Sequence, residues 1–496
     1  MKLNTKNITK VAYFSATSAK VELPLYDRAG INQGIVHIGV GGFHRAHLAL
    51  YMEKLFNAGK AQQWGICGVG LRADDQKIAE ALKQQDYLYT LYELKEAEDK
   101  AQVIGSIVDF ILAVKEPQRL IEKLVDADTR IVSLTITEGG YCIDDNTGLF
   151  NPLLPQVIAD INDPDNPKTA FGYLALALKL RRDAGTKPFT VMSCDNLPNN
   201  GKVTRQVMLS FTQLIDPELS DWIATNVSFP SAMVDRITPA TSDAHRKQLL
   251  DVTGIDDIWP VVCEPFTQWV IEDDFCNGRP PWEEVGVQFT DNVAAFEEMK
   301  IGLLNGSHLS MALLGVLYGL DFAHQTMQYS ALQAFVRDYM DRDVTPKLTV
   351  IANVDFSEYK DTLISRFSNP IICDQLQRIG SDASSKFPKF ILPTLQWLLE
   401  NNQPIDRVAM IIAAWMLYLK GTDEQDRSYS IPDPKADVLL AALAKPGHKV
   451  TNFLALQEVF GNQLSNNSNV VEAVEKQLEN LKTQGVNGTL ALMGYR

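Results

Sequence analysis

A repeated pattern of strand, turn and helix constrains the fold of this chain more than any other feature. Residues 35–40 (IVHIGV) are rich in β-branched side chains and run into the turn GVGG, after which residues 43–58 have helical character. A second apolar run at 64–69 ends in GLRADD, and helical periodicity returns at 76–85. This alternation predicts a βαβ unit.

The alternation continues through the first half of the chain and then gives way to helices. Strand-like runs at 130–137 and 189–193 are separated by helix-like stretches, as a parallel sheet requires. After GRPP at 278–281 long helical patterns take over, at 294–320, 328–340 and 407–419. We therefore predict an α/β fold: an N-terminal Rossmann-like doubly wound domain at residues 1–290, followed by a mainly α-helical C-terminal domain at residues 291–496.

Composition excludes several classes of protein. At 496 residues, with 46% hydrophobic residues, the chain is long enough for roughly two to four domains with cores. Its net charge of −15 repels phosphate backbones and anionic membranes, so we expect no nucleic-acid or membrane partner. Six cysteines lie far apart without a C-x-x-C pair, which predicts buried free thiols. The N-terminus has no apolar run of signal-peptide length, so we expect a cytoplasmic protein.

One long apolar segment needs its own explanation. Residues 301–320 contain no acidic residue, lysine or arginine, but they include Asn305, Ser307, His308 and Ser310. Polar side chains are costly in lipid, so this segment predicts a buried helical region that keeps its polar groups for a chemical purpose.

The glycine turn after the first strand has the residue types that bind a dinucleotide. Gly39, Gly41 and Gly42 let the backbone approach a pyrophosphate, and the following helix offers N–H donors and positive partial charge. His44 replaces the third glycine of G-x-G-x-x-G, so an ordinary tight turn is the alternative. His44 and His47 share a helix face, but no third ligand is signalled nearby, and we predict no metal site.

Asp74 and Asp75 follow the second strand, where the ribose of a dinucleotide would lie. A carboxylate there accepts hydrogen bonds from the ribose hydroxyls and repels a 2′-phosphate, which favours NAD over NADP. The alternative is that one of the two caps the helix beginning near Gln76. Arg72 is suited to a 2′-phosphate, so the acidic pair alone does not fix the choice.

The densest group of polar residues lies at 297–308, EEMKIGLLNGSH. Read as an α-helix at about 100° per residue, this segment places Glu297, Lys300, Asn305 and His308 on one broad face. A lysine that works as a base near pH 8 needs its pKa lowered from about 10.4, which desolvation achieves. Lys300 is therefore a candidate general base. The alternative is an interface helix in which Lys300 pairs with Glu297.

Asn196 stands at the carboxyl end of the strand predicted at 189–193, within SCDNLPNNG. Ligands of open α/β sheets bind at this edge, and an amide there is able to donate a hydrogen bond to an oxyanion. The alternative is an asparagine-rich turn without a function.

Several motifs together resemble the polyol-specific long-chain dehydrogenase family. They span nearly the whole chain: GVGGFHRAH (39–47), TITEGGYCIDD (135–145), SCDNLPNNG (193–201), MVDRITP (233–239), KIGLLNGSHL (300–309) and SDASSKFPKF (381–390). TEGGYCIDD and DNLPNNG are similar to the branch that interconverts D-mannitol and D-fructose. The resemblance implies hydride transfer between C2 of a polyol or ketose and NAD, without a metal, in a monomeric enzyme.

The resemblance also implies roles for individual residues. Lys300 is the general base, Asn196 and Asn305 form an oxyanion hole, and His308 orients the substrate. Glu297 and Glu138 match positions linked to proton relay and gating. The polyol-contacting positions are Asp235, Arg378 and Lys386, for which a network of ion pairs between domains is the alternative. The cofactor-binding positions are Ile38, Gly39, Val40, Gly41, Gly42, Phe43, Arg45, Asp74 and Asp75.

Two other functions stay open. A fructuronate or tagaturonate reductase of the same family would share the lysine helix and use Arg378 or Lys386 to hold a substrate carboxylate. A catalytically inactive dinucleotide-binding sensor predicts damage at Lys300 or Asn305, and both residues are present. Zinc and short-chain dehydrogenases are disfavoured, because the sequence lacks closely spaced Cys and His ligands and a Tyr-x-x-x-Lys pair.

Overall fold

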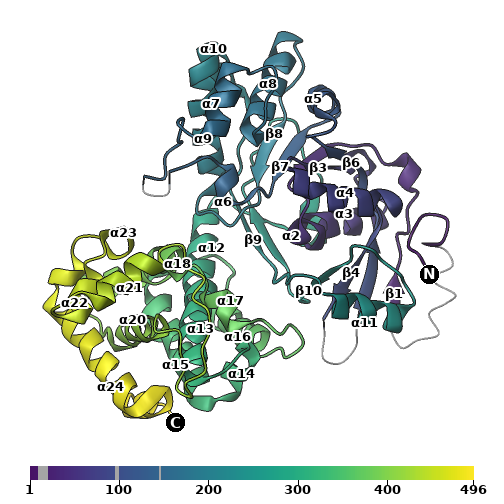
Figure 1. The fold of residues 1–496 in the computed structure, drawn as a ribbon. Coiled ribbons are helices and arrows are strands. Elements are labelled where there is room, and N and C mark those ends of the chain that lie inside the picture. Colours follow the sequence, from purple (N-terminus) through teal and green to yellow (C-terminus); the bar gives the residue numbers. More distant parts are fainter. Residues whose placement is uncertain (9–19, 95–99, 145–146) are drawn as a thin grey trace. The chain divides into compact units, whose positions relative to one another are not determined.

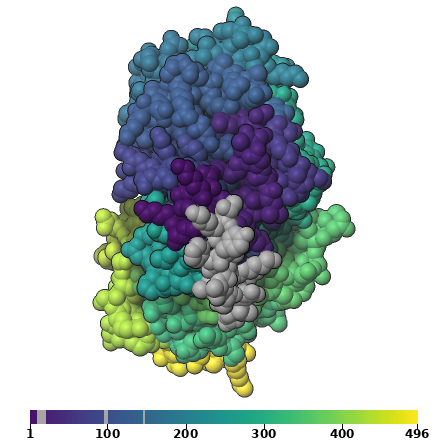
Figure 2. All heavy atoms as spheres, turned by 90° about the vertical axis from the view of Figure 1, so that its right-hand side faces the viewer, coloured from purple at the N-terminus to yellow at the C-terminus, as the bar shows by residue number. Residues whose placement is uncertain are grey.

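The computed structural model describes residues 1–8, 20–94, 100–144 and 147–496. These residues form two compact units, Met1–Ala294 and Ala295–Arg496 (Figure 1). In Figure 2 the N-terminal unit carries the purple to teal colours and the C-terminal unit the green to yellow ones. The first unit is built from strands and helices, and the second is helical.

A five-stranded parallel sheet forms the centre of the N-terminal unit. Its strand order is β6-β3-β2-β7-β8, and every neighbouring pair is parallel. The strands are β2 (Ile35–Ile38), β3 (Ile66–Gly70), β6 (Ile107–Leu112), β7 (Ile131–Leu134) and β8 (Thr190–Ser193). The order reverses at β2, which is the doubly wound arrangement of a Rossmann-like domain. The predicted fold class is confirmed.

Helices bury both faces of this sheet, because alternate residues of a strand point to opposite faces. Ile35 of β2 packs in one hydrophobic cluster with α3 (Leu48–Asn57), and Val36 packs in a second cluster. The helices of the second cluster include α5 (Pro117–Val125), α8 (Ala170–Asp183) and α9 (Asn200–Ile215). The other helices of this unit are α2 (Gly42–Ala46), α4 (Gln76–Gln84), α6 (Thr137–Gly140), α7 (Pro155–Asn162), α10 (Pro217–Asn226), α11 (Asp243–Thr253) and the 3-10 turns η1 (Arg28–Gly30), η2 (Gln62–Trp64), η3 (Ala73–Asp75) and η4 (Trp282–Val285).

Two small sheets accompany the parallel sheet, and the sequence did not predict them. One has the order β1-β5-β4-β10, with β1 (Lys20–Glu22), β4 (Tyr89–Glu93), β5 (Lys100–Ile104) and β10 (Val261–Cys263). The other has the order β12-β11-β9, with β9 (Ala232–Asp235), β11 (Gln268–Ile271) and β12 (Gln288–Phe289). These strands have two to five residues, so their apolar pattern is too short to stand out from a loop.

Glu53 is a fully buried carboxyl group in α3. It accepts hydrogen bonds from Tyr26 Oη at 2.7 Å and from the backbone nitrogen of Gly105 at 2.8 Å. Desolvation nevertheless raises the pKa of Glu53 from 4.5 to about 7. The folded protein therefore binds this proton more tightly than the unfolded chain does, and Glu53 stabilises the fold most at low pH.

Because the pKa of Glu53 rises from 4.5 to about 7 on folding, its contribution to the free energy of unfolding is expected to fall by about 3 kcal/mol between these two pH values. The free energy of unfolding of the native protein, minus that of Glu53→Gln, should decrease over this window and stay level above it. Chemical denaturation at a series of pH values measures both. Tyr26→Phe removes a donor that lowers the pKa of Glu53, so it should move the window to higher pH. A difference that does not change with pH contradicts the prediction.

The C-terminal unit is organised around a long helical segment, Val293–Tyr318. It is long and apolar enough to cross a membrane, but 78% of its most apolar window is buried inside the protein, so it is a core segment of the unit. The predicted buried helical region is confirmed. The helices after it are α14 (Ala323–Gln328), α15 (Ser330–Asp338), η7 (Thr345–Lys347), α16 (Phe356–Phe367), α17 (Leu376–Gly380), α18 (Ala383–Phe390), α19 (Leu392–Glu400), α20 (Asp406–Tyr418), α21 (Ala436–Ala444), α22 (Lys449–Leu454), α23 (Gln457–Phe460), η8 (Leu464–Asn466) and α24 (Ser468–Leu492).

The prediction of a regular α-helix across residues 297–308 is wrong. A π-helix, η5 (Lys300–Gly306), separates α12 (Val293–Met299) from α13 (Ser307–Tyr318). Its hydrogen bonds span five residues instead of four, so Lys300 and Asn305 lie closer to one face than an α-helix places them. The spacing of about 100° per residue therefore does not describe how the side chains of Lys300 and Asn305 are arranged around this segment.

Two glycines let η5 pack closely against its neighbours. A Cβ atom on Gly302 would lie 2.6 Å from Val344 Cγ1, and one on Gly306 would lie 2.7 Å from Tyr339 Oη. Tyr339 and Val344 are the first and last residues of a second π-helix, η6 (Tyr339–Val344). The distorted segment that carries Lys300 thus rests on another distorted segment, a tertiary contact that periodicity in the sequence does not reveal.

The cysteines follow the prediction in part. Four of them are buried and free: Cys67, Cys142, Cys194 and Cys263. Cys276 is half-buried, and Cys373 is exposed between α16 and α17, so the prediction of a buried thiol is wrong at Cys373. Cys373 lies in the segment that connects α16 to α17, and connecting segments are usually exposed.

Candidate active site

The glycine turn lies at the carboxyl end of β2, beside β7, where the strand order of the sheet reverses. Gly39 has a φ of +97°, and a Cβ atom on it would lie 2.1 Å from the carbonyl oxygen of Thr135. No other residue fits this backbone. Gly41 then precedes the first turn of α2. This is the position at which doubly wound sheets bind a dinucleotide.

The other residues of the predicted cofactor segment support the turn. Ile38 ends β2, Val40 is buried, and Phe43 stacks on His47 with ring centroids 4.8 Å apart. Arg45 is 3% exposed, and its guanidinium donates to the carbonyl oxygens of Gly41 at 3.3 Å and Trp259 at 2.5 Å. These hydrogen bonds of Arg45 therefore hold the glycine turn in place.

Three buried histidines lie beneath the turn. His37 stacks on His44 with ring centroids 3.4 Å apart, and His47 Nε2 contacts the carbonyl oxygen of Gln268 at 2.9 Å. Burial lowers the pKa of His37 and of His47 to about 3 and that of His44 well below its usual value, so all three are neutral. Across the described ranges no group of His, Cys, Asp or Glu side chains is placed to hold a metal ion.

His47 also interrupts the helix predicted at 43–58. Its dihedral angles, φ −125° and ψ −92°, are not helical, and α2 ends there before α3 begins. The ring of His47 reaches β11 through its contact with Gln268 instead. A tertiary hydrogen bond has overridden the local helical preference at this residue.

The acidic pair after β3 divides into two roles. Asp75 is half-buried and accepts a hydrogen bond from the backbone nitrogen of Arg72 at 2.9 Å, so it caps the local turn. Asp74 is exposed in η3. The predicted alternative, a cap on the helix that begins at Gln76, is wrong for Asp75, because its side chain makes no cap hydrogen bond to α4. Its carboxylate closes η3 instead, and Asp74 is the better candidate for a ribose.

Glu138 and Asn196 lie at the same edge of the sheet as the glycine turn. Glu138 is exposed in α6, directly after β7, and Asn196 is exposed directly after β8. Because β2, β7 and β8 are neighbouring parallel strands, their following loops emerge side by side. Asp145, at the end of the motif that contains Glu138, lies outside the described residues.

Asp235 ends β9 and is 5% exposed. The next residue, Arg236, is also buried, and it donates hydrogen bonds to the carbonyl oxygen of Ala46 at 2.7 Å and to Glu93 Oε1 at 2.9 Å. Arg236 therefore ties the strand that carries Asp235 to the end of α2. Arg236 stands inside the motif MVDRITP but was not among the predicted site residues.

The remaining catalytic candidates share the segment Val293–Tyr318 of the C-terminal unit. Glu297 and Lys300 are each 8% exposed. Asn305 is half-buried, and its Oδ1 atom is buried without a hydrogen-bond partner among the residues that the structure describes. A buried amide with unused hydrogen-bonding capacity is what a ligand-binding group requires.

Asp374 joins a predicted catalytic residue, His308, to a predicted substrate-binding residue, Arg378. Its carboxylate forms an ion pair with Arg378, and its Oδ2 atom lies 4.0 Å from His308 Nε2. His308 stacks on Phe367 with ring centroids 4.6 Å apart. Asp374 was not among the predicted site residues: it lies just before α17, so no helical spacing in the sequence pairs it with Arg378.

Lys386 lies on α18 and is held by the backbone. Its Nζ donates to the carbonyl oxygens of Ile379 at 3.0 Å and Ser381 at 2.6 Å. Burial lowers the pKa of Lys386, and nearby Arg378 lowers it further. Lys386, Arg378, Asp374 and His308 therefore form one polar cluster within the C-terminal unit.

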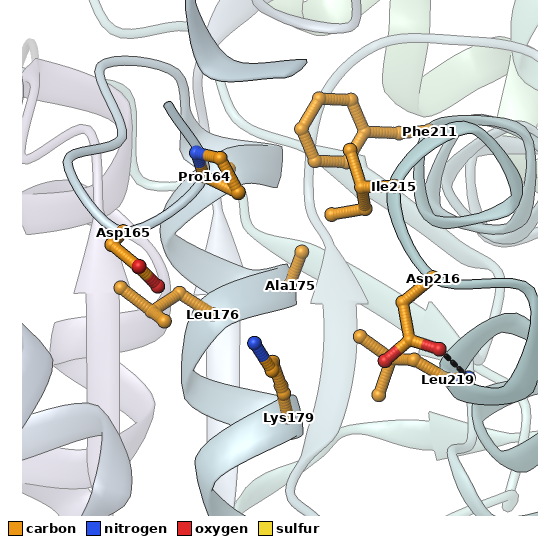
Figure 3. Close-up of a pocket in the computed structure, with 10 residues that line it drawn as sticks. Pro164, Asp165, Ala175, Leu176, Lys179, Phe211, Ile215, Asp216 and Leu219 are labelled. Carbon is orange, nitrogen blue, oxygen red and sulfur yellow. Dashed lines mark hydrogen bonds between the residues drawn. The ribbon is translucent and has the colours of Figure 1, made fainter. Parts of the chain in front are cut away.

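The pocket in Figure 3 is not a candidate for this chemistry. It is lined by residues of α8, α9, α10 and the turn before α8, among them Leu176, Phe211 and Leu219. Its cavity volume is about 40 Å³, whereas ligand sites usually have roughly 300–1,000 Å³. It has room for a water molecule and not for a dinucleotide or a polyol.

Two family models cover most of the chain. Residues 33–284 match the mannitol dehydrogenase Rossmann domain, and residues 292–482 match the mannitol dehydrogenase C-terminal domain. The chain belongs to the mannitol dehydrogenase family. The family predicted from the motifs is confirmed.

Relatives within the mannitol dehydrogenase family match over their full length. A mannitol 2-dehydrogenase of Aspergillus fumigatus is 43% identical over 497 residues, with 99% of this chain and 98% of the relative covered. The solved ternary complex of Pseudomonas fluorescens mannitol 2-dehydrogenase with NAD and D-mannitol is 53% identical, with a TM-score of 0.89 and 99% of both chains covered. A solved D-sorbitol dehydrogenase in substrate-free form is 38% identical, with a TM-score of 0.90 over 99% of this chain and 100% of that one.

Proposed function

We propose that this protein is an NAD-dependent oxidoreductase that interconverts D-mannitol and D-fructose. The observation that carries the proposal is its similarity over 99% of both chains to an enzyme solved with NAD and D-mannitol. The turn at Gly39 supports the proposal, because it lies where the strand order reverses and where doubly wound sheets bind dinucleotides. Lys300, Asn196 and Asn305 supply a base and two amide donors.

In the proposed mechanism, Lys300 accepts the proton of the C2 hydroxyl of D-mannitol. The amides of Asn196 and Asn305 donate hydrogen bonds to the alkoxide that develops on that oxygen. NAD supplies the nicotinamide ring that accepts the hydride from C2. Ketose reduction uses the same groups in reverse, with Lys300 returning the proton. Arg378, Lys386 and Asp235 bind the other hydroxyls, Glu297 and Glu138 relay protons, and His308 orients the substrate.

NADH oxidation, followed by absorbance, tests the proposal with D-fructose in one sample and D-fructuronate in another. We expect turnover with D-fructose, because Asp374 already neutralises Arg378 and leaves a weaker site for a substrate carboxylate. Turnover with D-fructuronate alone would contradict the proposal and identify a uronate reductase. Turnover with neither ketose would also contradict it. Monomeric assembly and a cytoplasmic location stay predictions from the sequence.

We expect chelation to leave the activity unchanged, because the base in this proposal is an amine and no metal takes part. In the described part of the chain no cluster of metal-ligating side chains stands near Lys300. Dialysis against EDTA followed by the fructose assay tests this. Activity that is lost with EDTA and restored by zinc would contradict a metal-free reaction.

Asp74 is expected to set the preference for NADH over NADPH. Asp74→Ala removes the carboxylate that would bind the ribose hydroxyls and repel a 2′-phosphate. Hydrogen bonds to charged groups contribute about 1.5–3 kcal/mol, so the ratio of kcat/KM for NADH to that for NADPH should fall by roughly 10- to 100-fold. Asp75→Asn, at the capping carboxylate, should change this ratio less. An unchanged ratio in Asp74→Ala would remove Asp74 from cofactor selection.

A further inference from the structure

One buried carboxylate, that of Asp195, joins the loops that carry Glu138 and Asn196. It accepts hydrogen bonds from the backbone nitrogens of Ile136 and Thr137, each at 2.9 Å. Asp195 is 8% exposed and directly precedes Asn196 in the chain. The carboxylate of Asp195 therefore fastens the loop after β7 to the loop after β8.

A phenol completes the hydrogen bonding of this carboxylate. Tyr141 Oη donates to Asp195 Oδ2 at 2.7 Å and lies 2.5 Å from Ser193 Oγ. Tyr141 is fully buried, and burial raises the pKa of its phenol well above the usual value, so it stays protonated. Asp195 thus has three donors, which hold its carboxylate in one orientation.

The backbone that Asp195 holds is strained. Thr137 has a φ of +61°, in the left-handed region that residues with a Cβ rarely adopt. Strain of this kind costs of order 1–3 kcal/mol and persists only where the surroundings hold it. The hydrogen bond from Thr137 to Asp195 is such a restraint, and the next residue is Glu138.

Asn200 fixes the other end of the loop that carries Asn196. Its Nδ2 atom donates to the carbonyl oxygens of Asp195 at 3.0 Å and Ala232 at 2.7 Å. Its Oδ1 atom accepts a hydrogen bond from the backbone nitrogen of Ala232 at 2.9 Å. Asn196 therefore lies between two residues that are anchored to neighbouring elements.

We propose that Asp195 is a positioning residue for the reaction, because its carboxylate holds the strained backbone at Thr137 and so sets the places of Glu138 and Asn196 relative to each other. The inference rests on the proposed function, in which Asn196 binds the alkoxide and Glu138 relays protons. A misplacement of about 1 Å at such a group costs up to roughly 10²-fold in rate.

The test compares Asp195→Asn with Asp160→Asn. Asparagine keeps the shape of Asp195. Its NH2 group, however, faces one of the backbone N–H groups from which the carboxylate accepted a hydrogen bond. Asp160 is a matched control, because it is fully buried and accepts hydrogen bonds from the backbone nitrogens of Lys168 and Thr169 at 2.7 and 2.9 Å. It belongs to α7, outside the loops after β2, β7 and β8.

Asp195→Asn is expected to lower kcat for D-fructose reduction by roughly 10- to 100-fold, with NADH affinity close to native. Asp160→Asn should keep its native kcat, although both variants lose stability. In the Asn196→Ala background, Asp195→Asn should lower kcat less than it does in the native background, because the two residues act together. A native kcat in Asp195→Asn, an equal loss in both Asp→Asn variants, or an additive effect with Asn196→Ala would overturn the proposal.

Hydrogen exchange separates this inference from the proposed function. The amides of Ile136 and Thr137 should exchange faster in Asp195→Asn than in the native protein, and at the native rate in Asp160→Asn. This result does not depend on the substrate, so it tests the restraint even if D-fructose is not turned over. Native protection of these amides in Asp195→Asn would overturn the inference. If Asp195→Asn does not fold, Tyr141→Phe removes one of the three donors, and a native kcat together with native exchange at both amides would overturn it.

Discussion

Lys300→Ala is expected to lower kcat for D-fructose reduction by roughly 10²- to 10⁴-fold, the range that general acid–base catalysis contributes. Without the ammonium group the carbonyl oxygen receives no proton as the hydride arrives at C2. NADH affinity, measured by fluorescence titration, should stay close to native, because the glycine turn belongs to the N-terminal unit and Lys300 belongs to the C-terminal unit. Steady-state NADH oxidation at saturating D-fructose gives kcat.

Lys360→Ala is the matched control for this variant. Lys360 is 6% exposed in the same unit, and its Nζ pairs with Asp341. Its removal should lower the free energy of unfolding and leave kcat native. Small primary amines added to Lys300→Ala should restore part of the rate, because their ammonium forms supply the missing general acid. Full activity in Lys300→Ala would exclude Lys300 as the base, and loss of NADH binding would show that the helix has been misassigned.

Asn305→Ala is expected to lower kcat by roughly 10²- to 10³-fold, the usual effect of removing one donor from an oxyanion hole. Asn196→Ala should have an effect of similar size, since in the proposed mechanism both amides donate to the developing alkoxide. KM for D-fructose should change less than kcat, because the hydrogen bonds strengthen as the alkoxide develops. Steady-state rates over a range of D-fructose concentrations separate the two constants.

Two variants sharpen the interpretation of Asn305→Ala. Asn305→Asp keeps the shape of the side chain but replaces the donor with an acceptor, so its kcat should fall at least as far as that of the alanine variant. Ser310→Ala removes a different buried polar group from the same helical segment, one whose Oγ donates to the carbonyl oxygen of Gly306 at 2.7 Å. Its kcat should stay near native. A native kcat in Asn305→Ala would remove this residue from the mechanism.

Much of the fold was predictable because its determinants are local in the sequence. The strand β2, the glycine turn and the helical segment after it each have a distinct composition, and their alternation implies a parallel sheet. The buried segment at residues 301–320 was equally clear, because a long run without charged side chains has few alternatives. The candidates Lys300, Asn305 and Asn196 follow from these same patterns together with the motifs.

The features that the sequence did not predict depend on contacts between distant residues. The π-helix η5 follows from the packing of Gly302 and Gly306 against Val344 and Tyr339, which no local periodicity records. The break at His47 depends on a hydrogen bond to Gln268. Short strands such as β9 are stabilised by their partners, because two to five residues carry too little pattern of their own.

The same division applies to the candidate site. Sequence by itself determined the candidates for the proposed chemistry, because an amine, an amide and a glycine turn have intrinsic properties that need no fold. Only the tertiary structure decided which residues hold them: Asp195 between two loops, Asp374 between His308 and Arg378, and Asp75 as a cap while Asp74 is exposed. A carboxylate has the same chemistry everywhere in a sequence, and its role is set by the donors and charges that folding brings within a few ångströms of it.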